Sequence, residues 1–187
     1  PELVFGLVGP IGVNMDDVQN SLREALLQVG YDAACIHLTK ALEKYQEKAK
    51  GSSGQTEYAR KINTANSFCR TLEDGAAMAA LAIMEIKSTR LDHNKEVRKL
   101  PAEQIDTAIP KRAYIIRQLK RKDEIKLLRR VYGDKFIQVS VSLPKAFRVE
   151  NLIKRMAVDH PHMKQAECEK NARNLIEIDE HEDGDDY

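Results

Sequence analysis

The first forty residues predict a strand, a glycine-rich loop, a helix and a second strand in direct succession. Residues 2–7 are short and apolar and are followed by spaced glycines, which is typical of a buried strand. Apolar residues recur at helical spacing over residues 18–29, Gly30 ends this helix, and residues 32–39 form the second strand. Because strands joined through a helix are typical of a parallel sheet, we expect an α/β fold, a parallel sheet with helices on both faces.

The rest of the chain continues the alternation of helices and strands. Further helices are predicted over residues 41–50, 56–72, 74–90, 123–132 and 148–157 and, as a last polar helix, after His162. Further strands are predicted over residues 112–119 and 135–142. The alanine-rich helix over 74–90 is apolar around most of its circumference, so we expect it to lie deep in the fold.

The loop after the first strand resembles a phosphate-binding P-loop with altered residues at its chemical positions. Read from Gly9, the pattern G-x-x-x-x-G-K-[ST] places Asn14 at the second glycine, Met15 at the lysine and Asp16 at the Ser/Thr. The backbone N–H groups of such a loop and the following helix N-terminus still attract phosphate. The residues expected to bind it are Gly9, Pro10, Ile11, Gly12, Val13, Asn14 and Asp16. The alternative is a loop that keeps only the shape of a phosphate site.

Phosphoryl transfer is not expected, and we predict no catalytic residue. The P-loop lysine and the Mg²⁺-binding hydroxyl are missing, and the strand over 112–119 carries Arg117 near its end, where a kinase uses an Mg²⁺-binding Asp. Arginine binds phosphate without a metal ion, so we expect Arg117, Arg148 and Arg155 to supply the positive charge. The alternative for each is a surface side chain on a solvated helix or strand end.

Charge is unevenly distributed along a chain whose formal net charge is +1. Residues 111–155 hold 14 Lys and Arg against 4 Asp and Glu, whereas residues 177–187 hold 7 Asp and Glu and no Lys or Arg. Solvated helix faces and a disordered acidic end would explain both blocks. A basic face over the phosphate loop is the alternative interpretation.

Cysteine and histidine positions argue against a disulfide framework or a metal site. The three cysteines are scattered, which is typical of a reducing compartment. His160, His162 and Cys168 lack a fourth ligand at a standard spacing, and His37 on a buried strand is interpreted as a core histidine. No apolar stretch is long enough to span a bilayer. We expect a cytoplasmic chain that does not contact membranes and is part of a longer protein.

Three stretches resemble, in order, the N-terminal P-loop-kinase-like domain of bacterial anti-phage dCTP deaminases: "ELVFGLVGPIGVNMDDV", "YDAACIHLTK" and "RAYIIRQLKRKDEIKLLRRVYGDKFIQVSVS". The resemblance implies a P-loop nucleotide-kinase-like domain over residues 1–158. Residues 159–187 would be a helical connection and acidic tail that leads toward a zinc deaminase domain. The zinc would lie in that domain alone, because this chain contains neither half of the H-x-E…P-C-x-x-C deaminase pattern.

The resemblance implies a regulatory or nucleotide-sensing domain of an antiviral enzyme that deaminates deoxycytidine nucleotides and so depletes them during phage infection. The expected ligand is a nucleoside triphosphate bound without Mg²⁺. Expected partners are the deaminase domain of the same chain, a regulatory RNA, or further copies in a homo-oligomer. The alternatives are an active nucleoside or nucleotide kinase and an RNA-binding or oligomerisation module.

Overall fold

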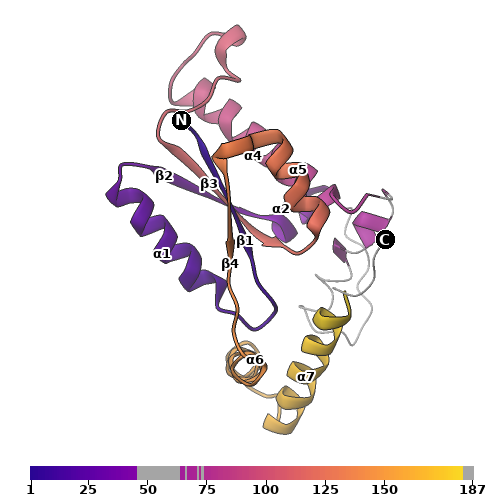
Figure 1. Ribbon diagram of the computed structural model, residues 1–187. Helices are drawn as coiled ribbons and strands as arrows, with labels where there is room; N and C mark the ends of the chain where they lie inside the picture. Colours follow the sequence, from indigo (N-terminus) through magenta and orange to yellow (C-terminus); the bar gives the residue numbers. More distant parts are fainter. Residues whose placement is uncertain (46–63, 66, 71, 73, 183–187) are drawn as a thin grey trace.

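Four parallel strands form one sheet, in the order β2-β3-β1-β4 (Figure 1). The computed structural model of the chain describes residues 1–45, 64–65, 67–70, 72 and 74–182. The strands are β1 (Leu3–Val8), β2 (Asp32–His37), β3 (Arg112–Leu119) and β4 (Phe136–Ser140). The predicted α/β fold with a parallel sheet is confirmed. Much of the sequence predicted as helices over 41–50 and 56–72 lies outside the described residues.

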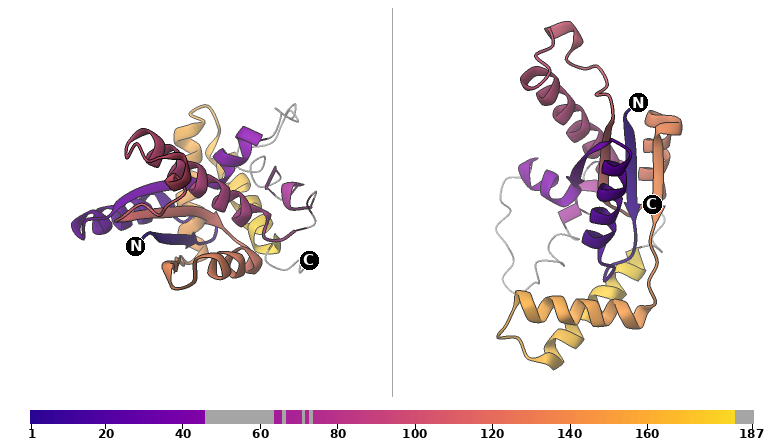
Figure 2. Two further views of the ribbon diagram at one scale, coloured as in Figure 1. Left: turned by 90° about the horizontal axis from the view of Figure 1, so that it is seen from above. Right: turned by 90° about the vertical axis from the view of Figure 1, so that its left-hand side faces the viewer.

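Helices cover both faces of the sheet. The helices are α1 (Met15–Gln28), α2 (Leu38–Tyr45), α4 (Ala77–Glu96), α5 (Lys122–Tyr132), α6 (Lys145–Asp159) and α7 (Gln165–Glu182), with 3-10 turns η1 (Ala102–Gln104) and η2 (Gly133–Lys135). Helix α1 lies on one face, and α2, α4 and α5 lie on the other (Figures 1 and 2). The crossover from β1 to β2 runs across the sheet in one direction, whereas those from β2 to β3 and from β3 to β4 run in the other. Because parallel crossovers are right-handed, this reversal places the helices on opposite faces.

The period of two along β3 divides the core into two layers. Ala113 and Ile115 pack with α1 on one face, whereas Tyr114 and Ile116 pack beneath α2, α4 and α5 on the other. All four side chains are fully buried. Burial on both faces explains why the central part of this strand is continuously apolar and why the sequence predicted it well.

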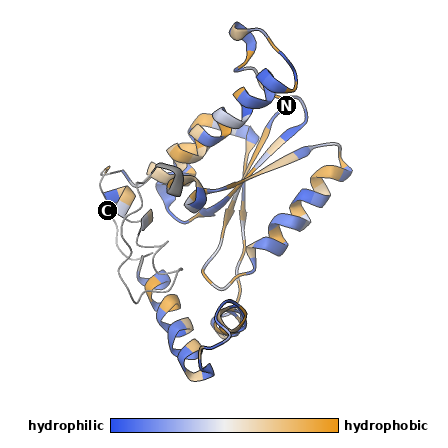
Figure 3. Ribbon diagram, turned by 180° about the vertical axis from the view of Figure 1, so that it is seen from behind, coloured by the Kyte–Doolittle hydropathy of each residue, from blue (hydrophilic) through white to orange (hydrophobic). Residues whose placement is uncertain are grey.

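Helix α4 lies deep only over its first half. Residues 77–82 are mostly buried, whereas Met84 is 56% exposed and the last turns are largely polar. Figure 3 shows the same change from hydrophobic to hydrophilic along the helix. The prediction of a deeply placed helix is therefore right for its beginning alone. None of the helices in the described ranges is both long and apolar enough to cross a membrane.

Helices α6 and α7 pack against each other beyond the carboxyl ends of the strands, with their axes crossing at a steep angle (Figures 1 and 2). Their own apolar cluster consists of Leu152, Met156, Cys168, Ala172, Leu175 and Ile176. Ile11, from the loop after β1, packs against this cluster. After α6, the described residues thus form α7, which shares this cluster with Ile11 of the loop after β1.

The loops after β1 and β3 leave neighbouring strands toward opposite faces of the sheet. Such a reversal opens a crevice at the carboxyl edge, where α/β proteins bind ligands. The β2 strand ends at His37, two residues earlier than predicted, because α2 begins at once with the buried Leu38. His37 therefore lies at the same carboxyl edge.

Candidate phosphate-binding site

A cavity of about 610 Å³ opens where the loops after β1 and β3 diverge. Its volume lies within the roughly 300–1,000 Å³ of ordinary small-molecule sites. Among the residues predicted to bind phosphate, those that line it are Gly9, Pro10, Ile11, Val13, Asp16, Arg117 and Arg155. The structure thus brings together most of a set that the sequence placed in three distant segments.

Gly12 holds the loop against α6 and does not line this cavity. Its φ of +91° is a conformation that other residues rarely adopt, and a Cβ atom there would lie 2.7 Å from the Cβ and carbonyl oxygen of Arg148. Asn151 Nδ2 also donates a hydrogen bond to the Gly12 carbonyl oxygen at 3.0 Å. Asn14 is exposed and donates to Asp17 at 2.6 Å. Both predicted site residues, Gly12 and Asn14, therefore shape the loop from outside the cavity.

Met15 fills the place of the P-loop lysine. A Cβ atom on Gly9 would lie 2.2 Å from the methyl carbon of Met15, so this side chain folds back over the loop. Met15 also packs with the apolar layer beneath α1. A thioether supplies no positive charge, and the cations near the loop come from other elements.

Asp16 and Arg117 form an ion pair at the positions where a kinase would hold Mg²⁺. Arg117 Nη1 donates to Asp16 Oδ1 at 2.6 Å, and Arg155 Nη2 lies 3.9 Å from Asp16 Oδ2. The hydrogen bond from Arg117 holds the pKa of the Asp16 carboxyl below its ordinary value. The carboxylate is therefore neutralised by guanidinium groups of the chain itself.

A bulge in β3 positions Arg117. The pairing of β1 with β3 shifts between Gly6 and Val8, and Gln118 adopts a φ of 70°. Such bulges re-aim side chains next to functional sites. Arg117 is only 8% exposed, and its Nε atom has no hydrogen-bond partner within the described part of the chain. A buried guanidinium with an open donor beside a cavity is suited to bind an anion.

The start of α5 fixes the loop after β3. Glu124 is 2% exposed, and its Oε2 accepts hydrogen bonds from the backbone nitrogens of Lys120 at 2.7 Å and Arg121 at 2.9 Å. Burial raises the pKa of this carboxyl. Both basic residues line the cavity, so this capping interaction holds the backbone of two cations at its rim.

His37 lines the cavity as well and is only half-buried. This position differs from the predicted core histidine, because β2 ends here at the carboxyl edge. Burial, together with the charges of Arg117 and Lys40, lowers the pKa of His37. These effects favour the neutral ring, which offers the cavity a hydrogen-bonding group without charge.

Two acidic residues of α7 reach this region and were missed in the sequence. Asp179 Oδ2 accepts a hydrogen bond from the Ile11 backbone N–H at 2.7 Å, and its Oδ1 lies 2.6 Å from Lys120 Nζ. The next residue, Glu180, accepts from Arg148 Nη2 at 2.7 Å. The buried α7 positions Cys168, Ala172, Leu175 and Ile176 recur at helical spacing. Continuing that spacing to Asp179 would have indicated a buried carboxylate.

The basic block over residues 111–155 does not form a continuous unpaired face. Arg112 pairs with Asp32, Lys154 with Glu150, and Lys145 and Arg148 both with Glu180. Predicted site residue Arg148 is thus turned toward α7 and does not line the cavity. It is buried, and its Nε and Nη1 atoms have no hydrogen-bond partner among the described residues.

The histidines and cysteine considered for zinc are separated by burial. Cys168 is buried between α6 and α7, whereas His160 and His162 are exposed in the connection between these helices. Within the described ranges, no three His, Cys, Asp or Glu side chains are grouped so that they could hold a metal ion.

The chain matches no protein-family model and no curated protein. Among solved structures, it is similar to the crystal structure of a protein provisionally described as a fructose transport system kinase from Silicibacter sp. TM1040. The identity is 17%, with 95% of this chain and 85% of that chain covered and a TM-score of 0.41. A likeness at this level says nothing about the molecule that this chain binds.

Proposed function

We propose that this chain is a nucleotide-binding regulatory domain that holds the phosphates of a nucleoside triphosphate without Mg²⁺ and without transferring them. The observation that carries the proposal is the ion pair between Asp16 and Arg117 beside a cavity that the phosphate loop lines. Backbone N–H groups of the loop would bind phosphate oxygens, and Arg117 and Arg155 would balance their charge.

The cavity favours a ligand with several negative charges. Arg117, Lys120, Arg121 and Arg155 all line it and come from the end of β3, the loop that follows and α6. Asp16, Glu124 and Asp159 also line the cavity and oppose part of this charge. A triphosphate would extend along the cavity and place anionic oxygens near cations of all three elements.

Loss of phosphoryl transfer follows from the residues at three positions. Met15 cannot follow the transferring phosphate with a positive charge, and Arg117 has the wrong sign to hold Mg²⁺. Asp16 is able to bind a cation in principle, but its carboxylate already accepts a hydrogen bond from Arg117. Mg²⁺ would therefore have to displace a charge-assisted hydrogen bond before it could bind.

The resemblance described above supports a finer proposal. We infer that the domain controls a zinc-dependent deaminase of deoxycytidine nucleotides in the same protein, and that the deaminated nucleotide pool is that of a phage-infected cell. A regulatory RNA or a homo-oligomer would be a further partner of the domain. In that arrangement, this chain would sense the nucleotide and the neighbouring domain would supply the zinc and the hydrolysis.

A thermal-shift panel of ribo- and deoxyribonucleoside triphosphates, with Mg²⁺ and with EDTA, tests the proposal. A ligand at about 100 times its dissociation constant stabilises the folded state by roughly 2.7 kcal/mol, which is easily measured. We expect stabilisation in EDTA and no formation of nucleoside diphosphate during long incubation. Stabilisation that requires Mg²⁺, together with diphosphate release, would show an active kinase instead. A flat panel with salt-sensitive RNA binding would show an RNA-binding module.

A further inference from the structure

The end of α7 places a carboxylate in the donor set of the phosphate loop. The Ile11 backbone N–H donates to Asp179 Oδ2 at 2.7 Å, and Lys120 Nζ lies 2.6 Å from the other carboxylate oxygen. Asp179 is 7% exposed, so its carboxylate is shielded from water, whereas the Lys120 side chain is partly exposed. Each oxygen of one anion thus has its own donor, one from the loop backbone and one from a lysine.

These two donors are of the kind that binds phosphate. Loop N–H groups at the start of a helix and a nearby lysine are the usual partners of phosphate oxygens. Ile11 and Lys120 both line the cavity, together with Arg117, whose buried Nε atom has no partner within the described residues. These donors therefore form an anion subsite at the edge of the cavity, and the carboxylate of Asp179, which does not itself line the cavity, occupies it.

Glu180, the next residue of α7, pairs in a similar way with two cations of α6. Glu180 accepts hydrogen bonds from Lys145 at 2.8 Å and from Arg148 at 2.7 Å. The hydrogen bond from Lys145 and that from Arg148 hold the pKa of Glu180 below its ordinary value. The last turn of α7 thus brings two adjacent carboxylates to cations on both sides of the phosphate loop.

We propose that Asp179 occupies the phosphate subsite formed by the Ile11 N–H and Lys120, and that a phosphate group of a bound nucleoside triphosphate displaces it and releases the last turn of α7. This inference rests on the proposed nucleotide-binding function. A ligand that binds only when Asp179 has left stabilises the released form of α7. Binding at the loop is thereby converted into a change at the end of the chain's last described helix.

The last turn of α7 can leave without exposing the apolar cluster. Leu175 and Ile176 are the last buried apolar residues of α7 within the described part of the chain, and Ile178 is already 40% exposed. Asp179 and Glu180 follow them and are held by charged hydrogen bonds. Phosphate oxygens would replace the carboxylate at Ile11 and Lys120, so neither of these two donors would be left without a partner. Release of Glu180 would cost the buried Arg148 Nη2 its partner.

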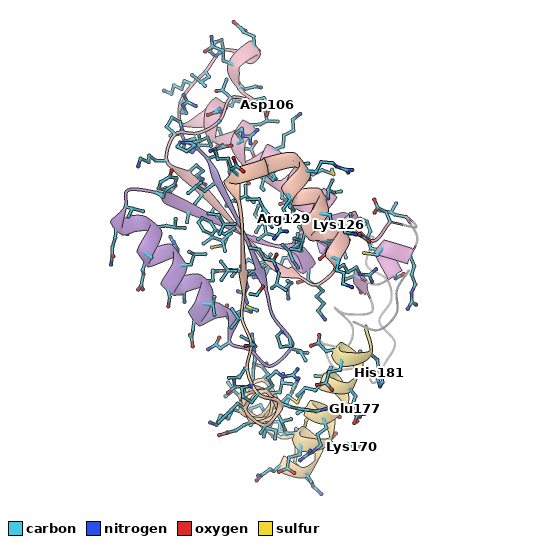
Figure 4. All side chains as sticks on the ribbon, in the orientation of Figure 1. Asp106, Lys126, Arg129, Lys170, Glu177 and His181 are labelled. Carbon is cyan, nitrogen blue, oxygen red and sulfur yellow. The ribbon has the colours of Figure 1, made fainter. Side chains whose placement is uncertain are left out.

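Titration of inorganic triphosphate in EDTA into the wild-type chain, Asp179→Asn and Glu177→Gln tests the competition. Asparagine retains an acceptor for the Ile11 N–H, so the variant should fold, but it lacks the charge that pairs with Lys120. Glu177 is an exposed carboxylate on the same helix and is the matched control (Figure 4). We expect Asp179→Asn to bind about ten- to a hundredfold more tightly than wild type. Glu177→Gln should bind as wild type does.

The outcomes separate this inference from the proposed function. Equal or weaker binding by Asp179→Asn, while wild type binds, would overturn the competition and leave the nucleotide site intact. Binding by the variant alone would support both. If neither protein binds triphosphate or any nucleotide, the proposed function fails, and the inference fails with it.

Hydrogen exchange in the wild-type chain gives a second test that needs no variant. Saturating inorganic triphosphate should raise the amide exchange rate of residues 179–182 and lower that of the loop around Ile11. Unchanged or slower exchange in the last turn of α7, with the loop protected, would show that phosphate binds while Asp179 stays in place and would overturn the inference.

Discussion

Arg90 and Arg117 lie toward opposite ends of the sheet and are held in different ways. Arg90 donates from all three of its nitrogens, with Nε and Nη2 to Glu2 at 3.1 and 2.7 Å and Nη1 to Asp106 at 3.3 Å. Arg117 donates from Nη1 to Asp16 at 2.6 Å and leaves the buried Nε unpartnered within the described residues. Figure 4 labels Asp106 at the end of the molecule far from α7.

The network around Glu2 is closed. Glu2 Oε1 also accepts hydrogen bonds from the Ile109 backbone N–H at 2.8 Å and from the Tyr114 hydroxyl at 3.3 Å. Burial, followed by the charge of Glu2, raises the pKa of Tyr114 to about 12. Glu2, Arg90 and Asp106 thus have their partners within the fold, and none of them lines the cavity at the carboxyl end.

The cluster around Arg90 has a structural role, whereas the cluster around Arg117 is arranged to face a ligand. A buried donor without a partner costs free energy, and a ligand that supplies an acceptor recovers that cost. All three nitrogens of Arg90 already donate to carboxylates, whereas the buried Nε of Arg117, which lines a cavity, has no partner within the described residues. We therefore expect stability to depend on the amino end of the sheet and binding to depend on the carboxyl end.

The largest stability effect is expected for Arg90→Met. Removing one partner of a mostly buried pair leaves Glu2 uncompensated and should lower the free energy of unfolding by about 3 kcal/mol, measured by urea denaturation. Lys87→Met on the same helix removes an exposed pair with Asp106 at 3.4 Å and should cost about 0.5 kcal/mol or less. Equal losses in the two variants would contradict a structural role for the network of Arg90.

The second-largest loss of stability is expected for Gly12→Ala, because at the carboxyl end of the sheet the loop backbone lies against α6. The left-handed φ and the contact with Arg148 should together cost about 2 kcal/mol of unfolding free energy. Gly30→Ala is the control, because Gly30 has a φ of +77° and open space around its Cα. It should lose about 1 kcal/mol from the backbone alone. Similar melting temperatures for the two variants would show that α6 does not press against the loop.

Much of the fold could be predicted because β3 is buried on both faces. Its apolar run predicted Arg112–Leu119 to the residue, and the loop glycines ended β1 within one residue of its observed limit. Strand β2 was extended too far because "IHLT" is as compatible with a strand as with the start of α2. Pattern alone does not separate these states where the chain passes directly from strand to helix.

The site was predicted less completely, because its charges are paired across the fold. Arg117 and Asp16 are 101 residues apart in the sequence, and their opposite signs give no local signal of an ion pair. Asp179 was placed within an acidic end, since its neighbours are acidic as well. Only its position on the buried face of α7 distinguishes it, and burial depends on where α7 packs.

The smallest stability effect is expected from His37. Its folded pKa lies below the ordinary 6.5, so the unfolded chain binds the proton more tightly, and stability falls as the pH drops from 6.5 toward the folded pKa. The loss should be small because the ring is half-exposed, and His37→Asn should remove this part of the pH dependence. Asp16 affects stability at lower pH. Because its folded pKa is lowered, its contribution to stability is present above its ordinary pKa of 3.8 and is lost as the pH falls below that value. An unchanged profile in His37→Asn between pH 5 and pH 7 would contradict the assignment.

The most direct test is calorimetric titration of a nucleoside triphosphate in EDTA into wild type, Arg117→Met and Arg129→Met. Arg129 is an exposed arginine on α5 that donates to Gln138, and it serves as the control (Figure 4). We predict Mg²⁺-independent binding by wild type and Arg129→Met and at least about tenfold weaker binding by Arg117→Met, with less than about 1 kcal/mol change in its unfolding free energy. Binding that requires Mg²⁺, or that is unaffected by Arg117→Met, would contradict the proposed nucleotide site.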